Sequence, residues 1–137
     1  MLISTKWRYA LYVLVDLAKH KDDGYIPLKE IAERQNISKK YMENILKTLV
    51  EHGMLEGVKG KGGGYRLTRC TEDYSLGEIL RLTEGNLAPV PCASETHDKC
   101  QRMETCPTRP VWRKLDTIIN DYLDGVTLAD LIEQDLE

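Results

Sequence analysis

Three closely spaced cysteines carry the most specific chemistry in this chain. They form the pattern Cys92-x7-Cys100-x5-Cys106 inside a segment, residues 86–107, that contains three prolines and shows no helical repeat. Thiolates bind soft metal centres, which include zinc, copper(I) and iron–sulfur clusters. The residues alone leave three interpretations open: a 2Fe-2S cluster, a zinc site, or thiol redox chemistry, with no chemistry at all as the plain alternative.

A complete metal site needs a fourth ligand beyond the three cysteines. His97 lies between the first and the second of these cysteines, and it could complete a Cys3His zinc site. The remaining cysteine, Cys70, follows a predicted hairpin and is expected to be structural. Cysteines in a cytosolic chain do not by default form a disulfide framework.

A second set of side chains suited to binding lies on a predicted helix from Ser38 to His52. Its apolar side holds Met42, Ile45, Leu46, Leu49 and Val50, and its polar side holds Lys39, Lys40, Glu43, Asn44 and Lys47. Such polar residues can contact the phosphates and base edges of DNA. A lysine-rich helix face is more often only a solvated surface, so the pattern needs support from its neighbours.

Several positions on this helix have two interpretations. Ser38 is expected to cap the helix, and with Lys39 and Lys40 it lies at the positive end, where phosphate binds well. Tyr41 either contacts a phosphate through its hydroxyl or packs its ring. Glu43 either accepts a hydrogen bond from a cytosine amino group or forms an ion pair with Lys39 or Lys47.

A basic hairpin is predicted directly after this helix. Gly53 is placed to end the helix in a left-handed conformation, and strands at residues 55–59 and 65–67 flank a Gly-Lys-Gly-Gly-Gly tip. Lys59, Lys61, Gly62 and Gly63 are expected to lie along the DNA backbone. The tip is not a nucleotide phosphate loop, because it lacks the spacing and the following Ser or Thr of that motif.

The elements upstream complete a helix-turn-helix unit. Residues 1–21 and 27–36 are predicted helices, and a short turn closed by Ile37 leads into the helix at Ser38. Trp7 lies on the apolar stripe of the first helix, where core packing or a dimer contact is expected. The fold class is therefore mainly α with a small β-hairpin: a winged helix-turn-helix DNA-binding domain plus a long dimerisation helix.

The C-terminal half supplies that long helix. Residues 71–74 are expected to be a linker, and a fourth helix should begin at the Ser75–Glu78 capping pattern. Thr108 is expected to cap the long helix, whose apolar stripe suits either the core or pairing with a second chain. The expected dimer-interface residues are Val111, Leu115, Ile118, Ile119 and Tyr122. A short last helix should begin at Thr127–Asp130, another capping pattern.

The charge distribution separates the two halves. The net charge is −3, but residues 1–70 hold 13 basic and 8 acidic side chains, whereas residues 71–137 hold 6 and 14. The half with the predicted DNA-binding elements thus has a net charge of +5, and the other half has a net charge of −8. Binding to nucleic acid requires a positively charged surface of this kind on the part that contacts it. No sufficiently long apolar run predicts a membrane span or a signal peptide, and a cytoplasmic protein is expected.

The chain resembles a known family over nearly its full length: the bacterial winged-helix regulators that include IscR, NsrR and CymR. The resemblance depends on four motifs, namely S-T-K-W-R-Y-A, I-A-E-R-Q-N-I-S-K-K-Y-M-E, V-K-G-K-G-G-G-Y-R-L and C-P-T-R-P-V-W-R-K-L. The wing motif, followed by T-L-A-D-L near the C-terminus, is the most specific combination. The resemblance implies a homodimeric transcription factor in which the helix at residues 108–123 crosses its mate. It also implies that Cys92, Cys100 and Cys106 match the ligands of a 2Fe-2S cluster in the sensing members.

The chain departs from the family pattern at the fourth ligand. Some cluster-containing members have a histidine where this chain has Arg109, and others use an acidic residue of the partner where this chain has Arg8. The gap between the first two cysteines is also longer than usual. The fourth ligand therefore stays open among His97, Glu95, Asp98, Glu104 and an external thiol.

Together these observations predict a homodimeric repressor-type regulator, not an enzyme, that binds a pseudo-palindromic double-stranded DNA operator. The expected division is a DNA-binding region at residues 1–84, a sensor loop at 85–107 and a dimerisation region at 108–137. The expected signal is iron–sulfur, redox or cysteine status. The alternatives are a winged-helix protein-interaction module and a zinc- or thiol-switched regulator without a cluster.

Overall fold

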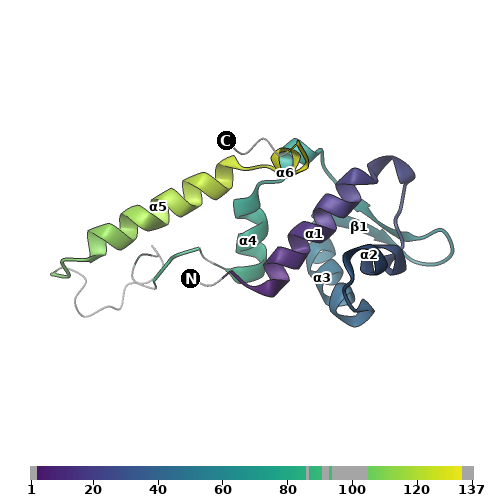
Figure 1. Ribbon diagram of the computed structural model, residues 1–137, viewed down its shortest axis with the longest axis horizontal. Helices are drawn as coiled ribbons and strands as arrows, with labels where there is room; N and C mark the ends of the chain where they lie inside the picture. The colour runs from purple at the N-terminus through teal and green to yellow at the C-terminus, as the bar shows by residue number, and fades with distance from the viewer. Residues whose placement is uncertain (1–2, 86, 91–92, 94–104, 134–137) are drawn as a thin grey trace.

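The computed structural model describes residues 3–85, 87–90, 93 and 105–133. Within these residues, six α-helices and one antiparallel hairpin follow one another along the chain, which confirms the predicted fold class (Figure 1). The elements are α1 (Thr5–Lys19), η1 (Lys21–Asp23), α2 (Leu28–Gln35), α3 (Lys39–Glu51), β1 (Leu55–Val58), β2 (Gly64–Leu67), η2 (Thr71–Asp73), α4 (Leu76–Glu84), α5 (Arg109–Gly125) and α6 (Leu128–Glu133).

The first helix, α1, is the scaffold against which most other elements pack. It contacts α2, α3, β2, α4 and α6. Its inward face is fully buried at Ala10, Val13, Leu14 and Leu17, and Trp7 is buried beside them. The helix begins at Thr5 because the Ser4 hydroxyl accepts a hydrogen bond from the Trp7 N–H at 3.2 Å. Trp7 is therefore a core residue.

The helix-turn-helix forms where it was predicted. Asn36 adopts a left-handed conformation, with φ 53° and ψ 47°, and so ends α2. The Ile37 N–H then donates to the Ala32 carbonyl at 3.0 Å, and the Ile37 side chain packs partly into the core. The hydroxyl of Ser38 accepts from the Tyr41 N–H at 3.2 Å, which starts α3.

The end of α3 is a Schellman motif. Gly53 has φ 74°, and its N–H donates to Val50 at 3.0 Å while the Met54 N–H donates to Leu49 at 2.9 Å. Glycine is favoured there because a side chain resists positive φ. Val50 was predicted to face inward but is 37% exposed at the edge of the helix. The Schellman turn directs the chain straight into β1.

The hairpin pairs Leu55 with Leu67 and Val58 with Gly64. It is anchored to the domain by a bridge between Ile26 and Tyr65, whose backbone groups exchange hydrogen bonds of 2.9 and 2.8 Å. At Gly64, which has φ 151°, a Cβ atom would overlap the backbone of Ile26. Only glycine permits this close approach, so the hairpin keeps a fixed position against the rest of the domain.

Tyr74 corrects the prediction that residues 71–74 are a simple linker. Its side chain is fully buried, and its hydroxyl donates to the Met54 carbonyl at 2.7 Å. The same oxygen accepts from the backbone N–H groups of Thr68 and Arg69 at 3.0 and 3.2 Å. One hydroxyl thus joins the end of α3 to the end of the hairpin.

We expect Tyr74→Phe to lower the free energy of unfolding by about 1–3 kcal/mol, because two backbone N–H groups lose their acceptor and the Met54 carbonyl keeps only the longer hydrogen bond from the Thr68 hydroxyl. Urea and thermal denaturation would measure this change. Tyr12→Phe is the matched control, since Tyr12 is 49% exposed and lies outside the proposed interfaces. Equal unfolding midpoints for the two variants would show that the Tyr74 hydroxyl is not a structural link.

The last three helices, α4, α5 and α6, form most of the described part of the acidic half. The hydroxyl of Ser75 caps α4, while the Glu78 carboxylate binds Arg69 at 2.9 Å instead of completing a capping box. A full capping box starts α6, because Thr127 and Asp130 each bond to the other's N–H, at 2.9 and 3.2 Å. Figure 1 shows α6 returning to the body of the molecule, whereas α5 extends away from it.

The start of α5 differs from the prediction in its cap. Thr108 precedes the helix, but its side chain forms no capping hydrogen bond to the backbone. Its Oγ1 instead lies 3.3 Å from Cys106 Sγ. Pro110 occupies the first turn, as predicted, because a proline needs no hydrogen-bond acceptor there. No helix of the described residues has the length and apolar character needed to cross a bilayer.

Candidate nucleic-acid interface

The outer face of α3 presents the predicted polar side chains to solvent. Lys39, Lys40, Glu43, Asn44 and Lys47 are all exposed, whereas Met42, Ile45, Leu46 and Leu49 are buried on the opposite face. None of the salt bridges among the described residues involves this outer face. The predicted alternative, in which Glu43 pairs with Lys39 or Lys47, is therefore not formed. The whole face is available to an external ligand.

Tyr41 holds the start of α3 against α1. Its ring meets the Tyr9 ring edge-on, with centroids 5.6 Å apart and planes at 89°. Edge-to-face contact of this kind is favourable for aromatic rings. The structure thus shows the ring packing of Tyr41, and the half-buried side chain fixes where the N-terminal end of α3 lies. Contact of its hydroxyl with a phosphate stays a prediction.

The hairpin tip carries two exposed lysines, Lys59 and Lys61. The tip closes through a hydrogen bond from the Gly63 N–H to the Gly60 carbonyl at 3.0 Å. Gly60 and Gly62 have φ of 92° and 79°, which explains the run of glycines. The tip is therefore a defined turn that carries positive charge on both of its lysines.

Arg66 on β2 differs from those lysines because it is paired within the protein. Its Nε donates to Glu56 at 3.0 Å, and its guanidinium lies over the Tyr25 ring. The hydrogen bond from Arg66 is the main cause of a lowered pKa at Glu56, with a smaller contribution from the Tyr25 hydroxyl. Since Glu56 neutralises Arg66, the net positive charge of the hairpin is concentrated at its tip.

Asp16 is a buried acidic residue that the sequence analysis did not single out. Its side chain is 2% exposed and accepts hydrogen bonds from Arg34 at 3.0 and 2.7 Å and from Gln35 at 2.9 Å. Burial raises the pKa of Asp16, but the hydrogen bonds and the charge of Arg34 outweigh this effect, so the pKa lies below its usual value. Asp16 thus connects α1 to the last turn of α2.

This network predicts a specific loss of stability in acid. Because the folded pKa of Asp16 lies below the unfolded value, its contribution is present above the unfolded pKa of 3.8 and is lost as pH falls through the folded pKa. We expect Asp16→Asn to cost roughly 1.5–3 kcal/mol at pH 7 and less at pH 3. Urea unfolding across that range would measure the difference. A cost that does not change with pH would contradict this assignment.

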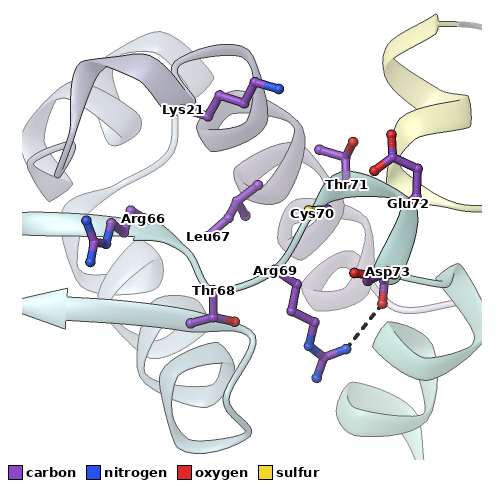
Figure 2. Close-up of a pocket in the computed structure, with 9 residues that line it drawn as sticks. All are labelled: Lys21, Arg66, Leu67, Thr68, Arg69, Cys70, Thr71, Glu72 and Asp73. Carbon is purple, nitrogen blue, oxygen red and sulfur yellow. Dashed lines mark hydrogen bonds between the residues drawn. The ribbon is translucent and has the colours of Figure 1, made fainter.

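A second open feature lies beside the hairpin. A groove of about 650 Å³ lies between Lys21, the segment from Arg66 to Cys70, and η2. Figure 2 shows the side chains that line it. Arg69 donates to the Asp73 carbonyl there and also to the Glu78 carboxylate. Cys70 was predicted to be structural, but its thiol side chain is exposed and precedes η2. Both arginines that line the groove already form ion pairs, Arg66 with Glu56 and Arg69 with Glu78.

The predicted cysteine site is only partly within the described residues. Cys92 and Cys100 lie outside them, as do His97, Glu95, Asp98 and Glu104. Cys106 is described: it is half-buried and lies three residues before the start of α5. In the part of the chain that the structure describes, no three metal-binding side chains come together.

The long helix α5 exposes an apolar stripe. Val111, Leu115, Ile118 and Tyr122 are 58%, 37%, 52% and 60% exposed. Ile119 differs, because it is half-buried against the core of its own chain. The helix is held on α4 by Arg81, which binds Asp124 at 2.7 and 2.9 Å and Asn120 at 2.6 Å. Gly77 allows this contact, since a Cβ atom there would overlap the Asp124 carboxylate.

Comparison with known proteins places this arrangement in a family. The sequence profile of the Rrf2 family, described as an iron-dependent transcriptional regulator, matches residues 3–134. The chain belongs to the Rrf2 family. The HTH-type transcriptional regulator IscR of Erwinia tasmaniensis is 34% identical over 132 residues, covering 96% of this chain and 79% of that protein.

Solved structures agree with this assignment. CymR (YrzC), the global cysteine regulator of B. subtilis, is similar with a TM-score of 0.80 and 31% identity, and the match covers 98% of both chains. IscR of T. potens is similar with a TM-score of 0.78 and 34% identity over 98% of this chain and 88% of that one. This Rrf2 protein is therefore a winged-helix transcriptional regulator and not an enzyme.

Proposed function

We propose that this Rrf2 protein is a homodimer that binds a pseudo-palindromic DNA operator with its two α3 helices. The observation that carries the proposal is the unpaired polar face of α3 next to a positively charged hairpin tip. A recognition helix of this type enters the major groove, and two helices related by a two-fold axis contact half-sites about one helical turn apart. The acidic half lies away from the duplex.

Within the proposed interface the residues have different roles. Ser38, Lys39 and Lys40 lie at the positive end of α3 and contact phosphate. Glu43, Asn44 and Lys47 contact base edges. Among the described residues Glu43 has no ion-pair partner, which supports acceptance from a cytosine amino group. The hairpin residues Lys59, Lys61, Gly62 and Gly63 follow the backbone. The ring of Tyr41 fixes the start of α3, and its hydroxyl contacts a phosphate there.

The second part of the proposal concerns the dimer. An exposed apolar stripe along a helix that extends from the body is typical of a helix–helix interface. We assign Val111, Leu115, Ile118 and Tyr122 to the contact with a second copy, with Ile119 at its inner edge. The proposed division is then a DNA-binding region at residues 1–84, a sensor loop at 85–107 and a dimerisation region at 108–137.

The third part concerns sensing. Three thiolates fit a soft metal centre, so Cys92, Cys100 and Cys106 would hold a 2Fe-2S cluster, with zinc as the alternative metal. Such a cluster supplies redox and nitric-oxide reactivity when bound. Cys106 lies three residues before the start of α5, and α5 is joined to α4 through Arg81. A ligand on the thiols is thus positioned to alter the spacing of the two DNA-binding units.

The DNA-binding proposal is tested by selecting bound fragments from random duplexes and measuring affinity by fluorescence anisotropy. A selected pseudo-palindrome should bind at least a hundredfold more tightly than scrambled DNA at about 0.15 M salt. If no duplex is preferred, the winged helix is a protein-interaction module instead.

The cluster is tested separately by anaerobic purification with iron and sulfide analysis and visible absorption. We expect about two irons and two sulfides per chain. Colourless, iron-free protein after anaerobic reconstitution would remove the cluster and favour zinc or a thiol switch.

A further inference from the structure

The buried carboxylate of Asp16 connects the scaffold helix to the helix-turn-helix unit. Asp16 lies on the inner face of α1. Its carboxylate accepts hydrogen bonds from the Arg34 guanidinium and the Gln35 side-chain amide, and these are the last two residues of α2. Asn36 and the turn into α3 follow immediately. Asp16 therefore holds the turn from which the recognition helix starts.

The geometry of this contact fixes the orientation of α2 relative to α1 as well as the distance between the two helices. Arg34 uses Nε and Nη2 on the two carboxylate oxygens at 3.0 and 2.7 Å, which is the bidentate arrangement. The Gln35 amide adds a third hydrogen bond of 2.9 Å, and His20 Nδ1 lies 3.7 Å away on the same side. A carboxylate with three donors from one helix end resists both sliding and rotation of α2 along α1.

The remaining contacts of α2 with α1 are less directional. Ile31 and Ala32 are buried apolar residues, and apolar packing tolerates small rotations more readily than a bidentate ion pair. On its other side α1 packs against α4 and α6, the helices that precede and follow α5 in the chain (Figure 1). The Asp16 contact thus lies between the helix-turn-helix and the proposed dimer helix.

We propose that Asp16 is a positioning residue for operator recognition: it sets the orientation of the helix-turn-helix unit on α1, and through it the separation of the two recognition helices of a dimer. This inference rests on the proposed function. It predicts that loss of the carboxylate weakens the discrimination among DNA sequences and half-site spacings more than it weakens DNA binding in general. Asp16 itself does not touch DNA.

The test compares wild type with Asp16→Asn, which keeps the side-chain size but presents an amide to Arg34. We expect the ratio of operator to scrambled-DNA affinity to fall roughly tenfold, the effect of misplacing one or two base contacts. We also expect the variant to discriminate less against an operator with one extra central base pair. Non-specific affinity should stay within about twofold, because the phosphate-binding lysines are unchanged.

Four further variants make the result specific. Arg34→Ala should lower the ratio similarly, and the double variant Asp16→Asn/Arg34→Ala should lower it no further than either change alone. Gln35→Ala removes only one of the three hydrogen bonds, so it should fold and give a smaller decrease even if Asp16→Asn unfolds. Glu78→Gln removes the Arg69–Glu78 ion pair and should leave the ratio unchanged.

The outcomes separate this inference from the proposed function. If Asp16→Asn and Gln35→Ala lower only the melting temperature and leave both the affinity ratio and the spacing discrimination unchanged, Asp16 is structural and the inference is wrong. If wild type itself prefers no duplex, the proposed function fails and the inference falls with it. If Glu78→Gln lowers the ratio of operator to scrambled-DNA affinity as much as Asp16→Asn does, the inference is also wrong.

Discussion

Ile118→Asp is expected to convert the proposed dimer into a monomer and to lower operator affinity at least a hundredfold. Ile118 is 52% exposed at the centre of the apolar stripe on α5. In a two-fold interface one substitution introduces two aspartates, and burying unpaired carboxylates costs several kcal/mol each. The isolated chain would keep its fold, because α5 has no fully buried residue among those described.

The loss of affinity follows from the loss of bivalency. When two recognition helices belong to one dimer, binding of the first places the second at an effective concentration of roughly millimolar, which raises avidity by about 10²–10⁴. A monomer loses this gain and binds each half-site separately. Sedimentation equilibrium at about 10 μM would measure the assembly, and fluorescence anisotropy would measure the affinity.

Thr117→Asp is the matched control for this substitution. Thr117 is exposed on the same helix, about 100° around the helix axis from Ile118 and away from the stripe, so the same charge should be tolerated there. A dimeric Ile118→Asp protein with wild-type operator affinity would show that α5 does not form the interface. Monomers in both variants would point to a general effect of charge on α5.

Local signals in the sequence located the elements of this fold well. Ser38 and Gly53 marked the two ends of α3, and the Thr127–Asp130 capping box marked the start of α6. These signals are reliable because each depends on atoms only a few residues apart. The order of a helix, a turn, a second helix and a glycine-rich hairpin then identified the winged-helix class.

The features that sequence reasoning missed depend on residues far apart in the chain. Asp16 interrupts an apolar stripe, and its partners Arg34 and Gln35 are 18 and 19 residues away. Tyr74 was placed in a linker because its acceptor, the Met54 carbonyl, is 20 residues earlier. A polar residue that interrupts a predicted apolar stripe is a useful signal in a sequence. When its side chain is buried, it needs a hydrogen-bond partner on another element.

The choice between alternatives at single residues also needed three-dimensional information. Tyr41 could pack or bind phosphate, and only the fold shows that its ring packs against Tyr9 on α1, while the phosphate contact of its hydroxyl stays a prediction. Thr108 matched a helix cap, but its hydroxyl lies near Cys106 instead. Sequence patterns give the set of groups that can interact, and the fold selects which of them meet.

Lys59→Ala/Lys61→Ala should weaken binding to every duplex by roughly ten- to a hundredfold at about 0.1 M salt. Each lysine that neutralises one phosphate releases counterions, so the slope of log affinity against log salt should become shallower by about 1.8 for the pair. The preference for operator over scrambled DNA should change little, since phosphate contacts carry no sequence information. Anisotropy titrations between about 50 and 300 mM salt would measure all three quantities.

Arg113→Ala/Lys114→Ala provides the charge-matched control. Both residues are exposed on α5, which Figure 1 shows at the opposite end of the molecule from the hairpin. Removing them changes the net charge equally, so any long-range electrostatic effect on DNA association appears in both variants. Only the hairpin variant should lose salt slope. An equal loss in both would mean that the lysines act through overall charge, and the hairpin would then have no direct contact with the phosphates.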